Sequence, residues 1–185
     1  MKRLFVAIKV ELSDEFRQSA RALQANLSYE KIVWEKDDLR HLTLRFLGAT
    51  PDSQIEPLKA ALADVARESE SFTMQLDKMG LFGSRYAPDV IWFGFEDFTP
   101  FRQLFDKLES RLQQVGFGPA YGNFVPHVTV ARIKHLQDKQ RFRRVLEQCR
   151  PKGAQTINVS EIILYQSFLH SDGPVYKPLA TYSLK

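Results

Sequence analysis

The chain has 185 residues, of which 44% are hydrophobic and 26% charged, as is typical of a globular protein. This length suits one domain, and folding can bury roughly 70% of the surface of the unfolded chain, so no covalent staple is needed. The single Cys149 cannot form an internal disulfide, and no run approaches the ~20 apolar residues of a membrane span. We therefore expect a cytoplasmic monomer without a membrane segment.

The charge balance favours an anionic partner. The net charge is +4 and the isoelectric point is near 9.2, and phosphates attract lysine and arginine at long range. Basic residues are concentrated between Lys134 and Lys152. A charge run of this kind is more often a solvated helix face than a binding site.

The first half of the chain alternates predicted strands and helices. Ser13 is a suitable N-cap for the first helix, Gly48 is expected to end the second strand, and Pro57 to delay or bend the second helix. The segments predicted, in chain order, are a strand at 3–10, a helix with an apolar stripe over 16–27, a strand at 41–47, a helix around 55–65, a strand at 72–76 and a loop around 80–88.

The same order recurs in the second half. Thr99 is a suitable cap, Pro100 suits the first helical position, and Gly116 is expected to close that helix. The segments predicted are a strand at 90–95, a helix with a stripe over 101–115, a strand at 127–133, a helix around 142–149 and closing strands at 157–165 and 175–182.

An offset of 86 residues relates the two halves. It separates His41 from His127 and relates Leu4 to Val90 and Ser13 to Thr99. We therefore predict an α+β fold in which a β-α-β-α-β unit occurs twice, with mainly antiparallel sheets flanking a central cleft and an approximate two-fold axis. Residues 1–185 would form a single bilobal domain, with an internal repeat at approximately 4–77 and 90–163.

Two His-x-Thr pairs occupy equivalent strands of this repeat. Residues two apart on a strand face the same side, so His41 projects with Thr43, and His127 with Thr129. A two-fold axis would bring both pairs together. One neutral imidazole can then accept a proton from an attacking oxygen while a protonated one donates to a leaving oxygen, and threonine hydroxyls can bind phosphate oxygens. The pattern indicates cleavage of a phosphodiester.

Other readings of the histidines are weaker. A single His-x-Thr pair is uninformative, but two at equivalent positions are a much stronger signal. The chain has no cysteine pair and no H-E-x-x-H sequence, so a third zinc ligand is hard to identify. His135 and His170 lie outside the repeat and are expected at the surface.

The motifs resemble those of a known superfamily. H-L-T-L-R-F-L-G at His41–Gly48 and P-H-V-T-V-A-R at Pro126–Arg132 are similar to the paired signatures of the 2H phosphoesterases. The closest similarity is to the LigT-like RNA 2′,3′-cyclic phosphodiesterases, historically called 2′-5′ RNA ligases. The resemblance extends from Arg3 to the end of the chain.

This resemblance implies a role for each matching residue. His41 would be the acid that protonates the departing 3′ oxygen, and His127 the base that activates water. Thr43 and Thr129 would bind the phosphate, which leaves a 2′-phosphate product. No metal or nucleotide cofactor is implied, and some members run the reverse ligation weakly. Two further roles are implied: base stacking by Phe46 and phosphate binding by Arg132.

Strand alternation conflicts with two of these roles. Phe46 and Arg132 stand five residues after their histidines, so a regular strand would turn them away from the site, and alternation alone favours Arg45. A bulge, or a strand that ends at that point, would reconcile the two, and we follow the resemblance for Phe46 and Arg132. Arg40 and Val125 depart from residues frequent in the family, and either could alter the choice of substrate.

Three functions stay open at this stage. The partner expected is RNA with a 2′,3′-cyclic phosphate end. The same chemistry would suit a small cyclic nucleotide or an ADP-ribose cyclic phosphate. A non-catalytic RNA-binding module is the alternative from another class, although binding alone gives no reason for two His-Thr pairs.

Overall fold

The computed structural model describes residues 1–84, 86–171 and 173–185, and these contain four α-helices. The helices are α1 (Asp14–Asn26), α2 (Ile55–Arg67), α3 (Thr99–Gln114) and α4 (Lys139–Gln148). The strands are β1 (Lys2–Lys9), β2 (Lys31–Trp34), β3 (His41–Thr50), β4 (Phe72–Leu76), β5 (Lys78–Gly83), β6 (Pro88–Gly94), β7 (His127–His135), β8 (Gln155–Val159), β9 (Glu161–His170) and β10 (Gly173–Ser183).

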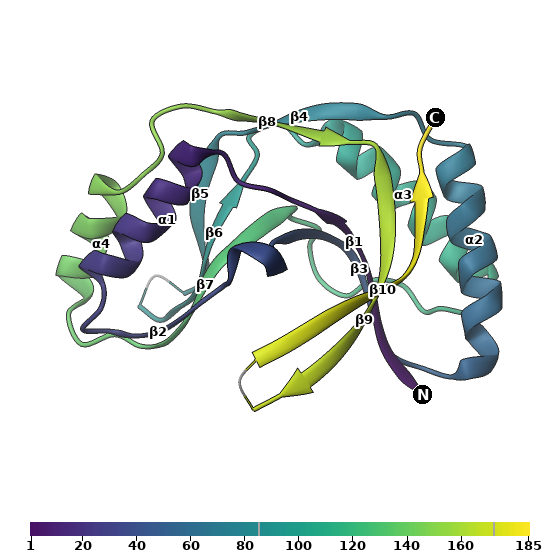
Figure 1. The fold of residues 1–185 in the computed structure, drawn as a ribbon, viewed down its shortest axis with the longest axis horizontal. Helices are drawn as coiled ribbons and strands as arrows, with labels where there is room; N and C mark the ends of the chain where they lie inside the picture. Colours follow the sequence, from purple (N-terminus) through teal and green to yellow (C-terminus); the bar gives the residue numbers. More distant parts are fainter. Residues whose placement is uncertain (85, 172) are drawn as a thin grey trace.

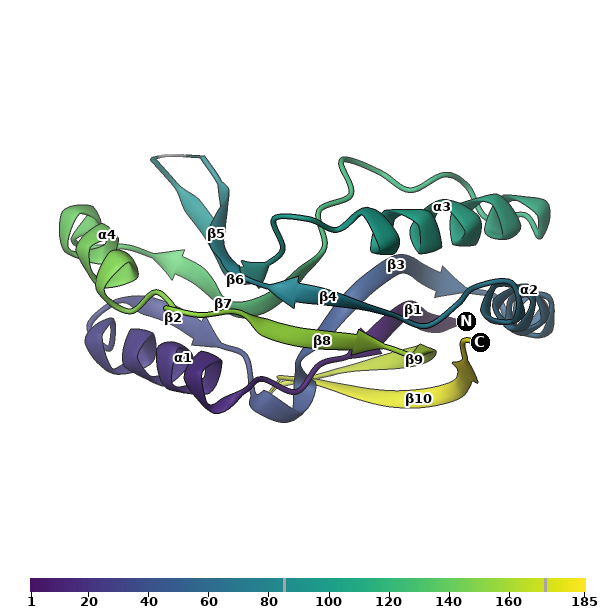
Figure 2. The same ribbon diagram turned by 90° about the horizontal axis from the view of Figure 1, so that it is seen from above.

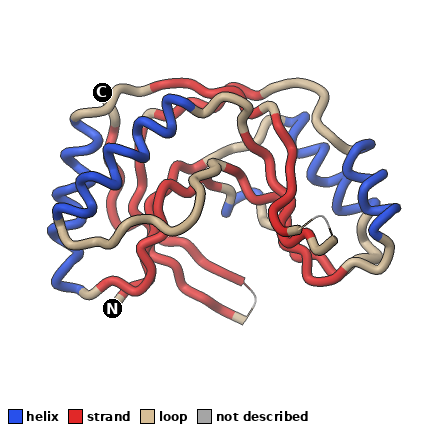
Figure 3. The backbone as a smooth tube through the Cα atoms, turned by 180° about the vertical axis from the view of Figure 1, so that it is seen from behind, coloured by secondary structure: helices blue, strands red, loops and turns tan. Residues whose placement is uncertain are grey.

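One eight-stranded antiparallel sheet organises the molecule. Its strand order is β10-β9-β1-β3-β7-β6-β5, with β2 paired to β7, while β4 and β8 form a separate two-stranded sheet. Helices α1 and α4 lie at one end and α2 and α3 at the other, as Figures 1 and 3 show from opposite sides. The predicted α+β class with antiparallel sheets is confirmed.

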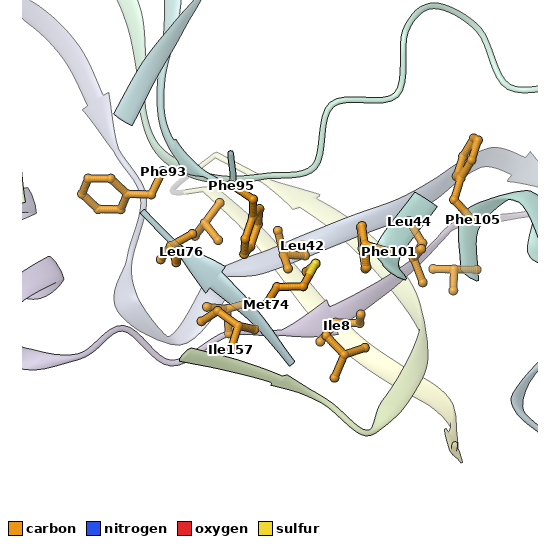
Figure 4. Close-up of a cluster of buried hydrophobic side chains, with 14 of the residues drawn as sticks. Ile8, Leu42, Leu44, Met74, Leu76, Phe93, Phe95, Phe101, Phe105 and Ile157 are labelled. Atoms are coloured by element: carbon orange, nitrogen blue, oxygen red, sulfur yellow. The ribbon is translucent and has the colours of Figure 1, made fainter. Parts of the chain in front are cut away.

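The core lies on one face of the large sheet, where the two-stranded sheet covers the middle. Leu42 of β3 points toward Met74 and Leu76 of β4 and Ile157 of β8, and Leu44 lies beside Phe101 of α3 (Figure 4); all six are buried. The alternate residues of β3 therefore face away from this core. We call that opposite side the site face.

The predicted apolar stripe of α1 is observed. The Ser13 hydroxyl accepts a hydrogen bond from the Phe16 amide, and Asp14 and Glu15 lie in the first turn, where the helix dipole favours carboxylates. Phe16 packs edge-on against Phe93 of β6, with ring centroids 5.0 Å apart. This contact fixes α1 to the core side of the sheet.

Several boundaries differ from those predicted. Strand β3 continues through Gly48, which has a φ of 71°, because two bulges bend the strand there without ending it. The segment predicted as a loop forms β5 and the start of β6, and β2 carried too short a pattern to be predicted. The strand predicted at 157–165 divides at Ser160 into β8 and β9. Pro57 lies in the first turn of α2, where it breaks no helical hydrogen bond.

The offset of 86 residues also relates observed elements: β1 to β6, α1 to α3, β3 to β7 and α2 to α4. The two ends of the molecule are nevertheless not the two sequence halves. Helix α1 packs beside α4, and α3 beside α2, as Figure 2 shows from above. Each end is therefore built from both halves of the chain. We call the part with β1, β3, β9, β10, α2 and α3 the His41 half, and the part with β2, β5, β6, β7, α1 and α4 the His127 half.

Among the residues described, no helix is both long and apolar enough to cross a membrane.

Candidate active site

The two halves meet at one bridge between β3 and β7. Leu42 pairs with Val128 in antiparallel register, and both are fully buried. In this register His41 lies opposite Thr129, and Thr43 opposite His127, all on the site face. The two histidines and the two threonines therefore stand around this bridge on one face of the sheet.

Each imidazole is held by a backbone carbonyl two residues earlier. His41 Nδ1 lies 2.7 Å from the Leu39 oxygen, and His127 Nδ1 lies 2.8 Å from the Val125 oxygen. A carbonyl oxygen only accepts, so Nδ1 carries the proton and Nε2 is unprotonated in the neutral ring. Both Nε2 atoms are therefore free to accept a proton, or to donate one once the ring is charged.

Both histidines are biased toward the neutral form. Burial lowers the pKa of His41 below its usual value, and the charges of His127 and Arg132 lower it further, while the bond to Leu39 opposes these effects. Burial likewise lowers the pKa of His127, with Arg132 adding to the effect and the bond to Val125 opposing it. A general base must be neutral, so the lowered pKa suits that role directly. A general acid must be charged, so that role requires a bound anion that raises the pKa of the imidazole again.

Aromatic rings surround each histidine, and the sequence reasoning assigned them no role. His41 lies 5.2 Å from the rings of both Phe5 and Tyr176. His127 lies edge-on to Phe82 at 4.6 Å and 6.5 Å from Trp92. These rings cause the burial that lowers both pKa values. Tyr176 lies within the part of the chain that resembles the family, but nothing in the sequence indicated that it would contact His41.

A bulge in β3 places Phe46 on the site face. Leu44 and Arg45 together oppose Val6, so the alternation of the strand shifts by one residue after Thr43. Phe46 then pairs with Phe5, at a ring separation of 6.0 Å, and its side chain is 62% exposed.

Arg45, which strand alternation favoured for the site, points the other way. Its Nε lies 2.6 Å from a Glu109 carboxylate oxygen of α3, and both side chains are largely buried. A second bond from Arg45 reaches the Gly118 carbonyl at 2.5 Å. Alternation alone assumed a regular strand; with the bulge Arg45 faces α3, and it still lines the cavity next to Thr43 and His127.

An equivalent bulge in β7 places Arg132 on the same face. Val130 and Ala131 together oppose Ile91, so Arg132 pairs with Val90 and projects on the side of His127 and Thr129. Arg132 is exposed and close enough for its charge to lower the pKa of both histidines. The two bulges are themselves 86 residues apart.

A cavity of about 320 Å³ adjoins this array. Thr43, Arg45, Phe46 and His127 line it, together with the loop at 120–125. His41 is not among its lining residues. The two predicted surface histidines, His135 and His170, are both exposed. Within the described residues, no three histidine, cysteine or acidic side chains gather closely enough to hold a metal ion.

Arg40 joins the two halves beside the bridge. Its guanidinium is buried and donates to the Thr129 carbonyl at 3.1 Å and to the Glu35 carbonyl at 3.2 Å, and its Nε lies 3.0 Å from an Asp37 oxygen. The sequence reasoning considered Arg40 only as a residue that could alter substrate choice. Its contacts instead make it a support for Thr129, and through the chain for His41.

We expect Arg40→Met to lower the free energy of unfolding by about 1.5–3 kcal/mol, because buried carbonyls lose a charged donor. Urea denaturation measures the change. Arg17→Met removes an exposed arginine paired with Asp14 and should leave the unfolding midpoint almost unchanged. Equal midpoints for the two variants would show that Arg40 is not a support.

We expect both site histidines to titrate below the ordinary histidine pKa of about 6.5. A lowered pKa in the folded state means that the unfolded chain binds protons first, so stability falls as the pH drops from about 6.5 toward the folded values. An NMR titration of ring resonances assigned with His41→Gln and His127→Gln measures both. Values above 6.5 would contradict the effect of burial.

The chain matches one protein family along most of its length. The profile of the LigT like Phosphoesterase family matches residues 10–92 and 97–176. An RNA 2′,3′-cyclic phosphodiesterase of Geobacillus stearothermophilus is 30% identical over 186 residues, which cover 100% of this chain but only 58% of that protein. Another of Thermotoga maritima is 29% identical, covering 96% of this chain and 92% of that protein.

A solved structure has the same fold. The crystal structure of TT0787 of Thermus thermophilus superposes with a TM-score of 0.79 at 26% identity, and covers 98% of this chain and 97% of that one. Both histidine motifs lie inside the residues that the family profile matches. This chain therefore belongs to the LigT-like phosphoesterases of the 2H phosphoesterase superfamily.

Proposed function

We propose that this protein hydrolyses the 2′,3′-cyclic phosphate at the end of an RNA, leaving a 2′-phosphate, without a metal ion. One observation carries the proposal: His41 and His127 each anchor Nδ1 on a carbonyl, and the bridge between Leu42 and Val128 brings their strands together with the two threonines on the same face. The printed names of the Geobacillus and Thermotoga relatives supply the substrate class.

The reaction divides between the two imidazoles. Water attacks phosphorus while Nε2 of His127 takes its proton, and the bond from phosphorus to the 3′ oxygen breaks. The charged ring of His41 gives its Nε2 proton to that oxygen, which becomes a free hydroxyl. His127 ends protonated and His41 neutral, so a proton must pass between them or through solvent before the next turnover.

The lowered pKa values fit this division. His127 is neutral at pH 7, as a base must be. The acid His41 has to be charged, and the negative phosphate beside it raises its pKa when substrate binds. The alkaline limit of kcat, which reports the complex, should therefore lie at higher pH than the alkaline limit of kcat/KM, which reports the free protein.

The phosphate and the base have separate contacts in the proposal. Thr43 and Thr129 donate their hydroxyls to the non-bridging oxygens, where charge is redistributed in the transition state. Arg132 adds a positive charge on the same face. The exposed ring of Phe46 stacks on a nucleobase. If a 5′-hydroxyl replaces water, the same steps form a 2′-5′ linkage, which is the weak reverse ligation that the family resemblance implies.

The first experiment identifies the product. The protein is incubated in EDTA with RNA bearing a 2′,3′-cyclic end, with 2′,3′-cyclic AMP, and with ADP-ribose cyclic phosphate. We expect RNA to be opened fastest and to migrate with an authentic 2′-phosphate standard. Loss of activity in EDTA that zinc restores would contradict the metal-free mechanism. A clear preference for either small compound would show that this compound, and not RNA, is the substrate.

The second experiment separates catalysis from binding. His41→Ala and His127→Ala should each lower kcat by about 10²- to 10⁴-fold, the usual contribution of a general acid or base. Affinity for a 3′-phosphorylated RNA should persist in both, because lysine and arginine supply most electrostatic attraction. The double variant should be little worse than either single one, since both groups act in one step.

A substrate with a good leaving group tests which histidine is the acid. With a nitrophenyl phosphodiester the departing oxygen needs little protonation, so His41→Ala should be less impaired than His127→Ala. Equal losses would remove the role assignment. Unchanged turnover in both single variants would leave an RNA-binding module as the function.

A further inference from the structure

The site face extends beyond Thr129 into a run of exposed basic residues. On β7, Arg132 opposes Val33 of β2, and the next pair, Ile133 and Ile32, turns toward the core. A second irregularity of β7 follows, because Lys31 pairs with His135 and leaves Lys134 as the extra residue. The extra residue of a bulge shares a face with its neighbour, so Lys134 and His135 both lie on the side of Arg132.

We call this surface the β2–β7 basic face. Its members are all exposed and stand on two adjacent strands of the His127 half: Lys31, Arg132, Lys134 and His135. It begins three residues after Thr129 and ends six residues after it, roughly 15–20 Å away at the rise of a strand. It is therefore continuous with the catalytic array.

The cations of this face are uncompensated, unlike many others in the protein. Lys78 pairs with Glu96 and Arg111 with Glu68. Across residues 1–84, 86–171 and 173–185, by contrast, no carboxylate lies within ion-pair distance of Lys31, Arg132 or Lys134.

The acidic residues nearest this edge are engaged elsewhere. The buried Glu30 accepts hydrogen bonds from the Gln137 and Asp138 amides, at 2.6 and 3.0 Å. The Asp138 carboxylate caps α4 by accepting from the Gln140 and Arg141 amides. Half-buried Glu35, whose pKa is raised by burial, lies near Arg132 at the inner end of the face. Neither Glu30 nor Asp138 forms an ion pair with Lys31 or Lys134 among the residues that the structure describes.

The opposite half differs in chemistry. Beyond His41, the site face carries the exposed Phe46 and the half-buried Tyr165 and Tyr176, with Phe5 beneath them. The exposed Arg3 stands two residues before Phe5, and its charge acts on Tyr176. A nucleobase suits the aromatic rings. Since the β2–β7 basic face groups Lys31, Arg132 and Lys134 on two adjacent strands, the charged part of a bound strand is expected on the His127 half.

We propose that the β2–β7 basic face binds the phosphates of the RNA nucleotides that precede the cyclic end, which makes a single-stranded oligonucleotide the preferred substrate over a mononucleotide. The proposal rests on the proposed function and deepens it. The terminal phosphate lies between the histidines, the terminal base lies on Phe46, and the preceding backbone passes Arg132 and continues toward Lys31 and Lys134. These lysines touch no reacting atom, so they act on binding alone.

The test compares two double variants of equal charge. Lys31→Ala with Lys134→Ala removes two cations from the face. Lys59→Ala with Lys107→Ala removes two cations from α2 and α3, away from the site face. Each is assayed with 2′,3′-cyclic AMP and with a short single-stranded RNA bearing a cyclic end, and binding of the same RNA with a 3′-phosphate is titrated over a range of salt.

We expect the first double variant to lose several-fold in kcat/KM for the RNA, through KM, and nothing for 2′,3′-cyclic AMP. Its plot of log affinity against log salt should flatten by about 0.7 for each lysine removed. The control variant should match the wild type with both substrates. Because the binding titration needs no turnover, it tests the face even if the wild type hydrolyses neither substrate.

Three results would overturn the proposal. Unchanged RNA affinity and salt dependence in the first double variant would show that the face does not bind RNA. It would then serve another partner, such as an acidic protein. An equal loss with 2′,3′-cyclic AMP would show that the lysines act within the catalytic site. An equal loss in the control variant would show that net charge, and not this face, attracts the RNA.

Discussion

The arrangement of the site depends on the single bridge between Leu42 and Val128. Each of these residues lies between a histidine and a threonine, so burying the pair on the core side turns all four polar side chains to the site face. A longer ladder would keep β3 and β7 side by side and flat. With a single bridge, the two strands diverge directly beyond it. Each histidine is therefore positioned by the half of the molecule to which its strand belongs. Arg40 compensates for the short ladder, because its guanidinium supplies donors to carbonyls that a continuing strand would have satisfied.

The bulges are the second structural requirement. A regular strand offers the site face every other residue, which would present Arg45 and Ala131 after the threonines. The extra residue at Leu44 and its equivalent at Val130 reverse that alternation and bring Phe46 and Arg132 forward. Arg45 is then turned against α3, where Glu109 neutralises it. The bulges at Leu44 and Val130 therefore bring Phe46 and Arg132 to the site face, and the first of them pairs Arg45 with Glu109.

The sequence predicted the parts of the structure that local pattern determines. The apolar stripes of α1 and α3, the strands that carry the histidines and the offset of 86 residues all follow from periodicity and side-chain type. It could not predict the bulges, since an extra residue in a strand alters no local preference and depends on the partner strand. Strands β2 and β5 were missed for a related reason. Strand β2 is only four residues long and is held by pairing to β7, which is distant in sequence, whereas β5 pairs with the adjacent β6 and carries Gly80 and Gly83, which are typical of loops.

Phe46 and Arg132 stand at equivalent positions, 86 residues apart, after equivalent bulges. The backbone is therefore nearly symmetric at these two positions, whereas the two side chains proposed to contact substrate there differ in kind. Two equivalent imidazoles in equivalent surroundings would bind a phosphodiester in either direction, and half of the complexes would offer the wrong oxygen to the acid. An aromatic ring on one side and a guanidinium on the other distinguish a base from a backbone phosphate. In the proposed reaction this difference sets the direction of the substrate, and the direction decides which histidine meets water and which meets the 3′ oxygen.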